Sequence, residues 1–317
     1  MVKLYDTTGF GYIEVEVEQF YSNDYPIFFA KTGKDTYLRD LGQPIYTVPE
    51  MLTGNRPADG GHLIIEAKDY DDFIRREPNA KKYIKRLIGS REFIQGKKRF
   101  CLWLVDCPPN EIRKMPLVYE RVKACKEDRL NGAPDRQKLA ATPWLFRDIR
   151  NPLRCLVVPK VSGERREYIP MDFVDNDVIL TDLLFMIPEA KYFHFGVLTS
   201  LPHMTWMRMV AGRLRNDYRY SVDVVYNNFP WPPFWREVEK TASKILMARK
   251  NYPEASFADL YDPVTMPADL RAAHEENDRA VMAAYDFPKN MTELQMQTAF
   301  LKMYDSLTKF DEIYNSL

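Results

Sequence analysis

The segment Arg213-Leu-Arg-Asn-Asp-Tyr-Arg-Tyr-Ser221 decides how the centre of this chain is interpreted. Three arginines and one aspartate stand at alternate positions, so an extended backbone points all four side chains the same way. A buried strand does not carry four charges on one face. A guanidinium donates twice to guanine O6 and N7, and a carboxylate accepts from cytosine N4. The pattern therefore indicates an exposed strand with the side chains that read DNA bases.

Composition and charge are compatible with a folded DNA-binding protein. The chain has 317 residues, of which 45% are hydrophobic, and this is enough to fill a core and excludes a disordered chain. Lys+Arg and Asp+Glu are both 45. The part from Glu237 onward holds 9 basic and 14 acidic residues, which leaves 36 and 31 in residues 1–236. A polyanion should therefore meet the first part of the chain.

The cysteines and the N-terminus favour a cytoplasmic protein. Cys101, Cys107, Cys125 and Cys155 lack metal-site spacing, so we expect reduced structural thiols and no bound metal. The N-terminus has no apolar signal segment, and no stretch of the sequence is apolar enough to span a membrane.

Hydrophobic periodicity predicts an α+β fold, with a mixed sheet-and-helix domain over residues 1–235 and a small helical domain over 236–317. Strands are expected at Tyr12–Val17, Ile27–Phe29, Ile45–Val48, His62–Ala67, Phe100–Val105, Cys155–Val158 and Val178–Leu180. Helices are expected at Asp69–Arg76, Ala80–Ile88, Glu111–Leu130, His203–Arg213, Trp235–Lys250, Pro267–Tyr285 and Met291–Leu317.

Basic side chains cluster before the central segment. Residues 76–99 contain nine Lys and Arg, among them Lys81 and Lys85, against two glutamates. Arg165-Arg166 adds a second basic site in the loop between two expected strands. Together with Arg213, these residues predict a surface that follows phosphates.

Two alternatives to DNA recognition remain open. Asp59, Glu66 and Lys68 mimic a nuclease pattern in which carboxylates at a strand end bind Mg²⁺ and a lysine orients the attacking water. A Gly-Gly turn and an ordinary strand explain the same residues. The other alternative is a protein-interaction scaffold whose helical tail docks a partner.

No motif indicates catalysis on a base. A methyltransferase needs a glycine-rich cofactor loop and an Asn/Asp-Pro-Pro-aromatic motif, and the sequence shows neither. Asp106-Cys-Pro-Pro-Asn110 is interrupted by Cys107, and Asn228-Phe-Pro-Trp231 has the wrong order. We interpret the latter as a rigid exit into the helical part.

Nine motifs in order resemble MmeI-like type II (IIG/IIL) restriction-modification enzymes, single chains that cut DNA and methylate adenine. These motifs are Gly54–Gly61, Ile88–Phe93, Arg99–Leu104, Pro159–Pro170, Phe195–Ser200, His203–Met207, Gly212–Leu214, Arg219–Ser221 and Tyr226–Pro232. The resemblance covers about residues 40–235 and matches the target recognition domain of the family. Beyond residue 236 it rests on position and helical character, which match the family's C-terminal helical region.

The resemblance implies a sequence-specific module for double-stranded DNA with no catalytic activity of its own, either an expressed piece or a truncated gene. Residues 1–50 would link it to the methyltransferase domain, which belongs with the nuclease domain to the same parent polypeptide. That parent would be an adenine-specific DNA methyltransferase with restriction activity that uses S-adenosylmethionine and Mg²⁺. This chain would hold neither cofactor.

The resemblance also implies site residues. Arg215 and Asp217 match a coupled pair whose charges family members exchange as the recognised base changes, and Arg219 matches a third base-contacting position. Lys160 and Asp182 match another coupled pair, and Leu183 lies beside it in place of the expected small residue.

Phosphate contacts are expected from residues around these positions. They are Arg165, Arg166, Tyr168, Arg213, Lys81 and Lys85. Gly163 stands where the family usually has a serine, so one phosphate contact of that loop is absent.

Overall fold

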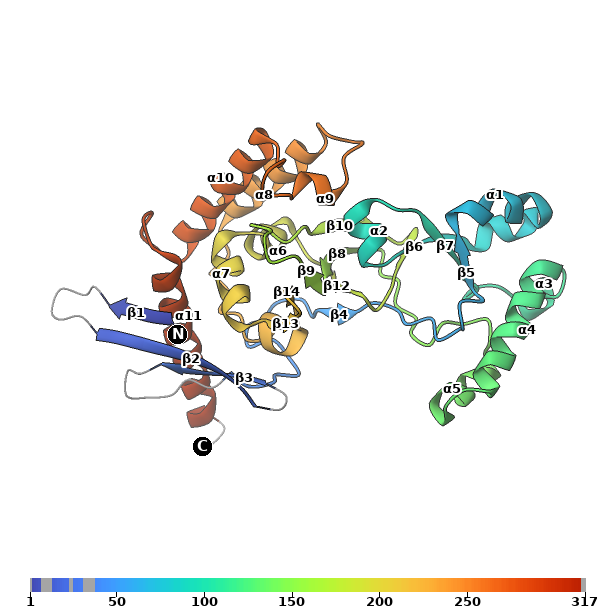
Figure 1. Cartoon of the computed structure of the whole chain (residues 1–317), viewed down its shortest axis with the longest axis horizontal. Helices are drawn as coiled ribbons and strands as arrows, with labels where there is room; N and C mark the ends of the chain where they lie inside the picture. Colours follow the sequence, from blue (N-terminus) through green and yellow to red (C-terminus); the bar gives the residue numbers. More distant parts are fainter. Residues whose placement is uncertain (1, 7–12, 23–24, 31–37, 315–317) are drawn as a thin grey trace.

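A computed structural model describes the backbone of residues 2–6, 13–22, 25–30 and 38–314 and the side chains of residues 38–308. Helices and several small sheets share the chain, which confirms the α+β class. Figure 1 shows an elongated molecule in which two four-stranded sheets occupy the middle, the C-terminal helices lie toward one end and α1 with α3–α5 lies at the other.

The first central sheet has the order β10-β8-β12-β4. Its strands are β10 (Asp172–Asp175), β8 (Arg154–Pro159), β12 (Leu184–Pro188) and β4 (Leu52–Thr53), and all neighbours are antiparallel. The inner strands β8 and β12 are mostly apolar and buried, as expected for strands covered on both faces. The strand predicted at Cys155–Val158 lies within β8.

The second central sheet has the order β11-β6-β7-β5. It contains β11 (Val178–Leu180), β6 (Ile84–Ile88), β7 (Arg99–Leu102) and β5 (Ile64–Glu66). The prediction of a helix over Ala80–Ile88 is wrong. A 3₁₀ turn, η1 (Pro78–Tyr83), leads into β6, where Leu87 and Ile88 are buried between two paired strands. Tertiary pairing overrides the local helical pattern of the basic residues.

A helical lobe covers the second sheet. It consists of α1 (Ala67–Arg76), α3 (Pro109–Ile112), α4 (Pro116–Leu130), α5 (Pro134–Lys138) and the short η2 (Leu139–Ala141). The short α2 (Ser90–Gln95) lies outside this lobe, because its Phe93 packs with residues of β8, β11 and β12. The helix predicted over Glu111–Leu130 is in fact two helices. Pro116 begins the second, because proline fits the first turn of a helix but not its interior.

The centre of the chain continues with α6 (Tyr192–Leu198), α7 (Leu201–Val210) and a π-helical turn, η3 (Val222–Tyr226). The hydroxyl of Ser200 caps α7 by accepting from the backbone N–H of His203. Asn228, two residues after η3, donates to the backbone carbonyls of Arg39, Asp223 and Val224. The motif Asn228–Trp231 therefore holds the segment at Arg39 in place, and it also leads into the C-terminal helices.

The C-terminal region contains α8 (Arg236–Arg249), α9 (Phe257–Leu260), α10 (Ala268–Ala284) and α11 (Glu293–Tyr314). The three predicted C-terminal helices correspond to α8, α10 and α11. Their apolar side chains share one core with β8, α6 and α7; Phe195, Trp206 and Phe300 are buried in it. Within the described ranges, no helix combines the length and apolar character that a membrane span requires.

The N-terminal strands β1 (Val2–Asp6), β2 (Ile13–Ser22) and β3 (Tyr25–Ala30) form an antiparallel sheet, which Figure 1 shows beside α11. Predicted strand residue Tyr12 lies outside the described residues. The strand predicted at Ile45–Val48 is absent from the described structure, because the N–H of Ile45 donates to Asn227 instead of to a neighbouring strand. The linking role of residues 1–50 stays a prediction.

Candidate nucleic-acid interface

The segment 213–221 forms a hairpin instead of a single extended strand. Strand β13 (Gly212–Leu214) pairs with β14 (Asp217–Arg219), and Arg215 and Asn216 form the two-residue loop. Arg215 has a φ of 57°, the positive value that a type II′ hairpin has at its first loop residue and that glycine adopts at least cost. Arg215 therefore lies at the tip of the hairpin, and the other three charged residues lie on its two strands.

Arg213 supports this loop from its base. Its guanidinium lies 3.8 Å from the centre of the Tyr218 ring on the opposite strand. Its Nη1 donates to the carbonyl of Asn216 at 3.0 Å. Both contacts hold the turn that carries Arg215, so Arg213 has a structural role, and its phosphate contact stays a prediction.

Asp217 faces the loop of residues 163–166. Gly163 lies close to both Asp217 and Arg166, because a Cβ built on it would stand 3.8 Å from the Asp217 Oδ1 and 3.8 Å from the Arg166 Nη1. Burial lowers the pKa of the Arg166 guanidinium, while Asp217 and Asp262 oppose this shift. Asp217 is thus near Arg166, and the exposed Arg215 is two positions before it on the same hairpin.

A third strand, β9 (Val161–Ser162), pairs with β14 and brings Lys160 to the hairpin. The N–H of Tyr220 donates to the carbonyl of Lys160 at 2.8 Å. The Lys160 ammonium lies 4.8 Å from the centre of the Phe185 ring. Burial lowers the pKa of Lys160; Asp182 opposes this, and Arg56 and Arg219 add to it. These four charges therefore interact.

A cleft of about 660 Å³ opens beside the hairpin. Lys160, Arg219 and Arg150 contribute basic side chains to its lining, and Asp40 and Asp223 contribute acidic ones. The cleft combines donors and acceptors in a form that suits the polar edges of bases.

Asp182 and Leu183 lie in the turn that leads into β12. Asp182 accepts from the Nε of Arg56 at 2.9 Å, whereas Leu183 is 53% exposed. Lys160 and Asp182 are thus neighbours, as the resemblance implies, but Arg56 is the direct partner of Asp182. Sequence reasoning missed Arg56, although it stands within the quoted motif Gly54–Gly61.

The residues expected on phosphates do not share one environment. Arg165 and Lys81 are exposed, whereas the Nζ of the half-buried Lys85 donates to the carbonyl of Asn176 at 2.6 Å. The phosphate contact predicted for Tyr168 is wrong. Its side chain is buried, stacks on His274 and donates to Asp278 at 2.7 Å, so the hydroxyl cannot reach DNA.

The carboxylate of Asp278 joins α10 to the loop of Tyr168 and to the start of α7. Besides Tyr168, it accepts from the N–H of Leu201 at 2.7 Å. Burial raises the pKa of Asp278 to about 7, against the two hydrogen bonds that lower it. The folded protein therefore binds this proton more tightly than an ordinary aspartate does.

This raised pKa predicts a pH-dependent stability. Because the folded state binds the proton more tightly than the unfolded chain, the contribution of Asp278 is largest in acid and is lost as pH rises from about 4 to about 7. We expect Asp278→Asn to reduce this part of the decline, since the amide carries no charge. Urea unfolding at pH 5 and pH 8 measures it; equal pH slopes in wild type and variant would contradict it.

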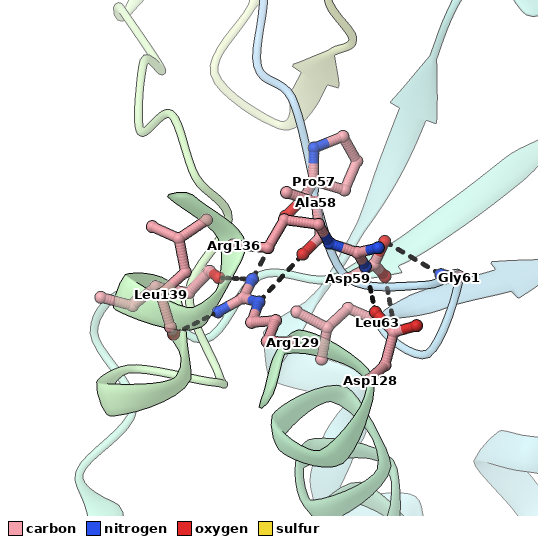
Figure 2. A network of polar contacts seen from close by, with 10 residues as sticks. Pro57, Ala58, Asp59, Gly61, Leu63, Asp128, Arg129, Arg136 and Leu139 are labelled. Atoms are coloured by element: carbon pink, nitrogen blue, oxygen red, sulfur yellow. Dashed lines mark hydrogen bonds and ion pairs between the residues drawn. The ribbon is translucent and has the colours of Figure 1, made fainter. Parts of the chain in front are cut away.

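Asp59 has a structural role that leaves neither carboxylate oxygen for the metal that the nuclease alternative requires. Its Oδ1 accepts from the N–H of Gly61 at 3.1 Å and its Oδ2 accepts from the N–H of Leu63 at 2.7 Å, so both oxygens close the turn before β5 (Figure 2). Within the described residues, no cluster of three His, Cys, Asp or Glu could hold a metal. Asp59 with Glu66 and Lys68 therefore does not fit a Mg²⁺ site.

Two family models cover most of the chain. The model of the MmeI target recognition domain matches residues 32–233, and that of the MmeI C-terminal domain matches residues 235–310. This chain belongs to the MmeI family. The match begins before the motifs that carry the resemblance and extends through the C-terminal helices.

Two known proteins are similar to nearly all of this chain. DNA methyltransferase A of Bacillus subtilis (strain 168) is 36% identical over 316 residues, which cover 95% of this chain and 36% of the relative. The solved structure of the type IIL restriction-modification enzyme MmeI in complex with DNA matches with a TM-score of 0.84 at 35% identity. That match covers 97% of this chain and 45% of the other. The chain thus spans less than half the length of these relatives.

Proposed function

We propose that this chain is the double-stranded DNA recognition module of an adenine-specific, S-adenosylmethionine-dependent DNA methyltransferase with restriction activity. Family membership supports this proposal, as does the similarity to a structure of MmeI in complex with DNA. The observation that carries it is the hairpin tip, where Arg215 is exposed beside Asp217. We further propose that catalysis belongs to other domains of the same polypeptide.

The hairpin reads one base pair in the major groove. The Arg215 guanidinium donates to guanine O6 and N7, while Asp217 accepts from N4 of the paired cytosine. Arg166 orients Asp217, because its guanidinium lies near the carboxylate from the neighbouring loop. The backbone of Arg215 is in a conformation that costs an arginine about 1 kcal/mol, which is typical of residues held in place for binding.

The cleft beside the hairpin reads further positions. Lys160 and Arg219 are its basic donors, and Asp182, whose charge acts on Lys160, is the acceptor at a neighbouring position. Leu183 is exposed beside Asp182 and suits the methyl group of thymine. Arg165, Arg166, Lys81 and Lys85 bind phosphates and set the register of the protein on the duplex.

The described residues do not fit the cofactors of the parent activity. S-adenosylmethionine requires a glycine-rich loop after a strand, which the sequence lacks, and Asp59 uses both carboxylate oxygens on backbone amides. We therefore assign S-adenosylmethionine and Mg²⁺ to the other domains, where the target adenine would be flipped out of the duplex. We also propose that this chain divides into two domains near residue 235, because the two family models meet there.

Duplex binding as a function of salt tests the proposed function. Four cationic phosphate contacts, each worth ~0.9 in the slope, predict that log K falls with log[salt] with a slope of about −4. Arg165→Ala should reduce the slope by about 1 and weaken all duplexes alike. Fluorescence anisotropy with a random 30-base-pair duplex measures both. Binding that is absent or independent of salt would instead favour a protein-interaction scaffold.

A further inference from the structure

We propose that Arg56 determines specificity by holding Asp182 in the orientation in which it accepts a hydrogen bond from a base. The inference rests on the proposed function, in which Asp182 reads a base. Arg56 acts through Asp182 and is therefore a positioning residue. Three observations carry it: the rigidity of the loop of residues 54–56, the fixed backbone of Arg56, and the geometry of its ion pair.

The loop of residues 54–56 is locked to the turn that carries Asp182. A Cβ on Gly54 would lie 2.2 Å from the carbonyl oxygen of Thr181, so a larger residue does not fit at this position. Asn55 donates from its N–H to Leu180 at 2.7 Å, and its carbonyl accepts from the N–H of Asp182 at 3.0 Å. The loop and the turn are therefore joined by direct backbone hydrogen bonds.

A third segment fixes the backbone of Arg56. Its N–H donates to the Oδ2 of Asp148 at 3.1 Å, and its carbonyl accepts from the N–H of Arg147 at 3.1 Å. The side chain of Asn55 exchanges two further hydrogen bonds with the backbone of Arg150. The base of the Arg56 side chain is thus fixed from two sides, although the side chain itself is exposed.

The ion pair leaves one side of each partner available. The Nε of Arg56 donates to the Oδ2 of Asp182 at 2.9 Å, with 58% of the Arg56 side chain and 25% of the Asp182 side chain exposed. Among the described residues, no other hydrogen bond involves either side chain. Oδ1 of Asp182 is therefore free to accept from cytosine N4 or adenine N6.

Stability does not explain this arrangement. An exposed ion pair contributes little to folding, so the rigid support of three loops is not needed for that purpose. The pair instead restricts the rotamer of a carboxylate whose charge acts on Lys160, and Lys160 lines the cleft together with Arg219. A side chain held in one rotamer discriminates between bases better than a mobile one.

A double-mutant cycle on the full chain tests the inference. Selection from a pool of randomised duplexes first identifies the base pair whose preference is lost in Asp182→Ala. We expect Arg56→Ala to lower discrimination at that base pair roughly tenfold, and the double variant to lose no more than Asp182→Ala alone. Arg56→Gln keeps an N–H donor without the charge and should retain most of the discrimination. Arg75→Ala, which removes an exposed arginine paired with Asp72 on α1, is the matched control.

The outcomes separate the two proposals. If Asp182→Ala abolishes the preference but Arg56→Ala leaves it intact, the inference is wrong while the proposed function stands. Additive losses in the double variant, or equal weakening of every duplex by Arg56→Gln, would assign Arg56 an independent phosphate contact and also overturn it. If Asp182→Ala changes no preference, Asp182 reads no base, and the inference fails together with that part of the proposed function.

Discussion

Arg129→Ala should lower the free energy of unfolding by about 4 kcal/mol or more, the largest effect that we expect from one substitution. Arg129 is 1% exposed, and its guanidinium donates to five carbonyls, those of Pro57, Ala58, Leu139, Thr142 and Leu145. Figure 2 shows this side chain between α4 and the loop before β5. Its removal leaves buried acceptors without donors and a cavity in their midst.

Urea unfolding measures this loss, and two further variants show its origin. Arg129→Lys keeps the charge but not the planar fork of five donors, so it should also be strongly destabilising. Arg136→Ala removes a partly exposed partner of Asp128 in the same view and should cost less than ~1 kcal/mol. A loss below about 1.5 kcal/mol in Arg129→Ala would mean that water or neighbouring groups replace the donors.

Arg215→Gly should separate stability from recognition. Because Arg215 has a φ of 57°, glycine relieves the strain of a Cβ at this position, whereas alanine retains it. We expect the glycine variant to be more stable than Arg215→Ala by about 1 kcal/mol. Both variants lose the guanidinium, so both should lose roughly 1 to 3 kcal/mol of preference for the specific duplex.

Thermal unfolding and competition between a selected and a scrambled duplex measure these two effects. The pair of variants is its own control, since they differ at one Cβ atom. Equal stability of the two would show that the loop relaxes around alanine. Retained preference for the selected duplex in either variant would show that Arg215 contacts no base.

Sequence periodicity predicted the helices whose apolar residues recur at helical spacing and the strand whose residues are nearly all apolar. Strand β8 and helices α8, α10 and α11 belong to this group. It failed where distant pairing decides, as at β6, whose basic residues resemble a helix face until β7 and β11 are beside them. It also failed at Arg215, since an arginine at positive φ gives no turn signal in the sequence.

The sequence predicted only some residues of the candidate site, because contacts between distant segments decide the others. The strands β9, β12 and β14 bring Lys160, Asp182 and Arg219 near one another, and Lys160 and Asp182 are the coupled pair that the resemblance implies. Tyr168 was misassigned because a tyrosine next to two arginines looks exposed, whereas α10 supplies Asp278 and His274 to bury it. Arg56 was missed because its partner lies 126 positions away in the sequence.

Base selection by a charge-exchanged hairpin tests the central claim most directly. The variant with Arg215→Asp and Asp217→Arg keeps both charge types and the net charge but exchanges donor and acceptor at the two positions. Sequencing of duplexes bound from a randomised pool should show one base pair inverted, from G·C to C·G, with the other positions unchanged. An unchanged preference at every position would contradict the account, because the hairpin tip would then not choose the base.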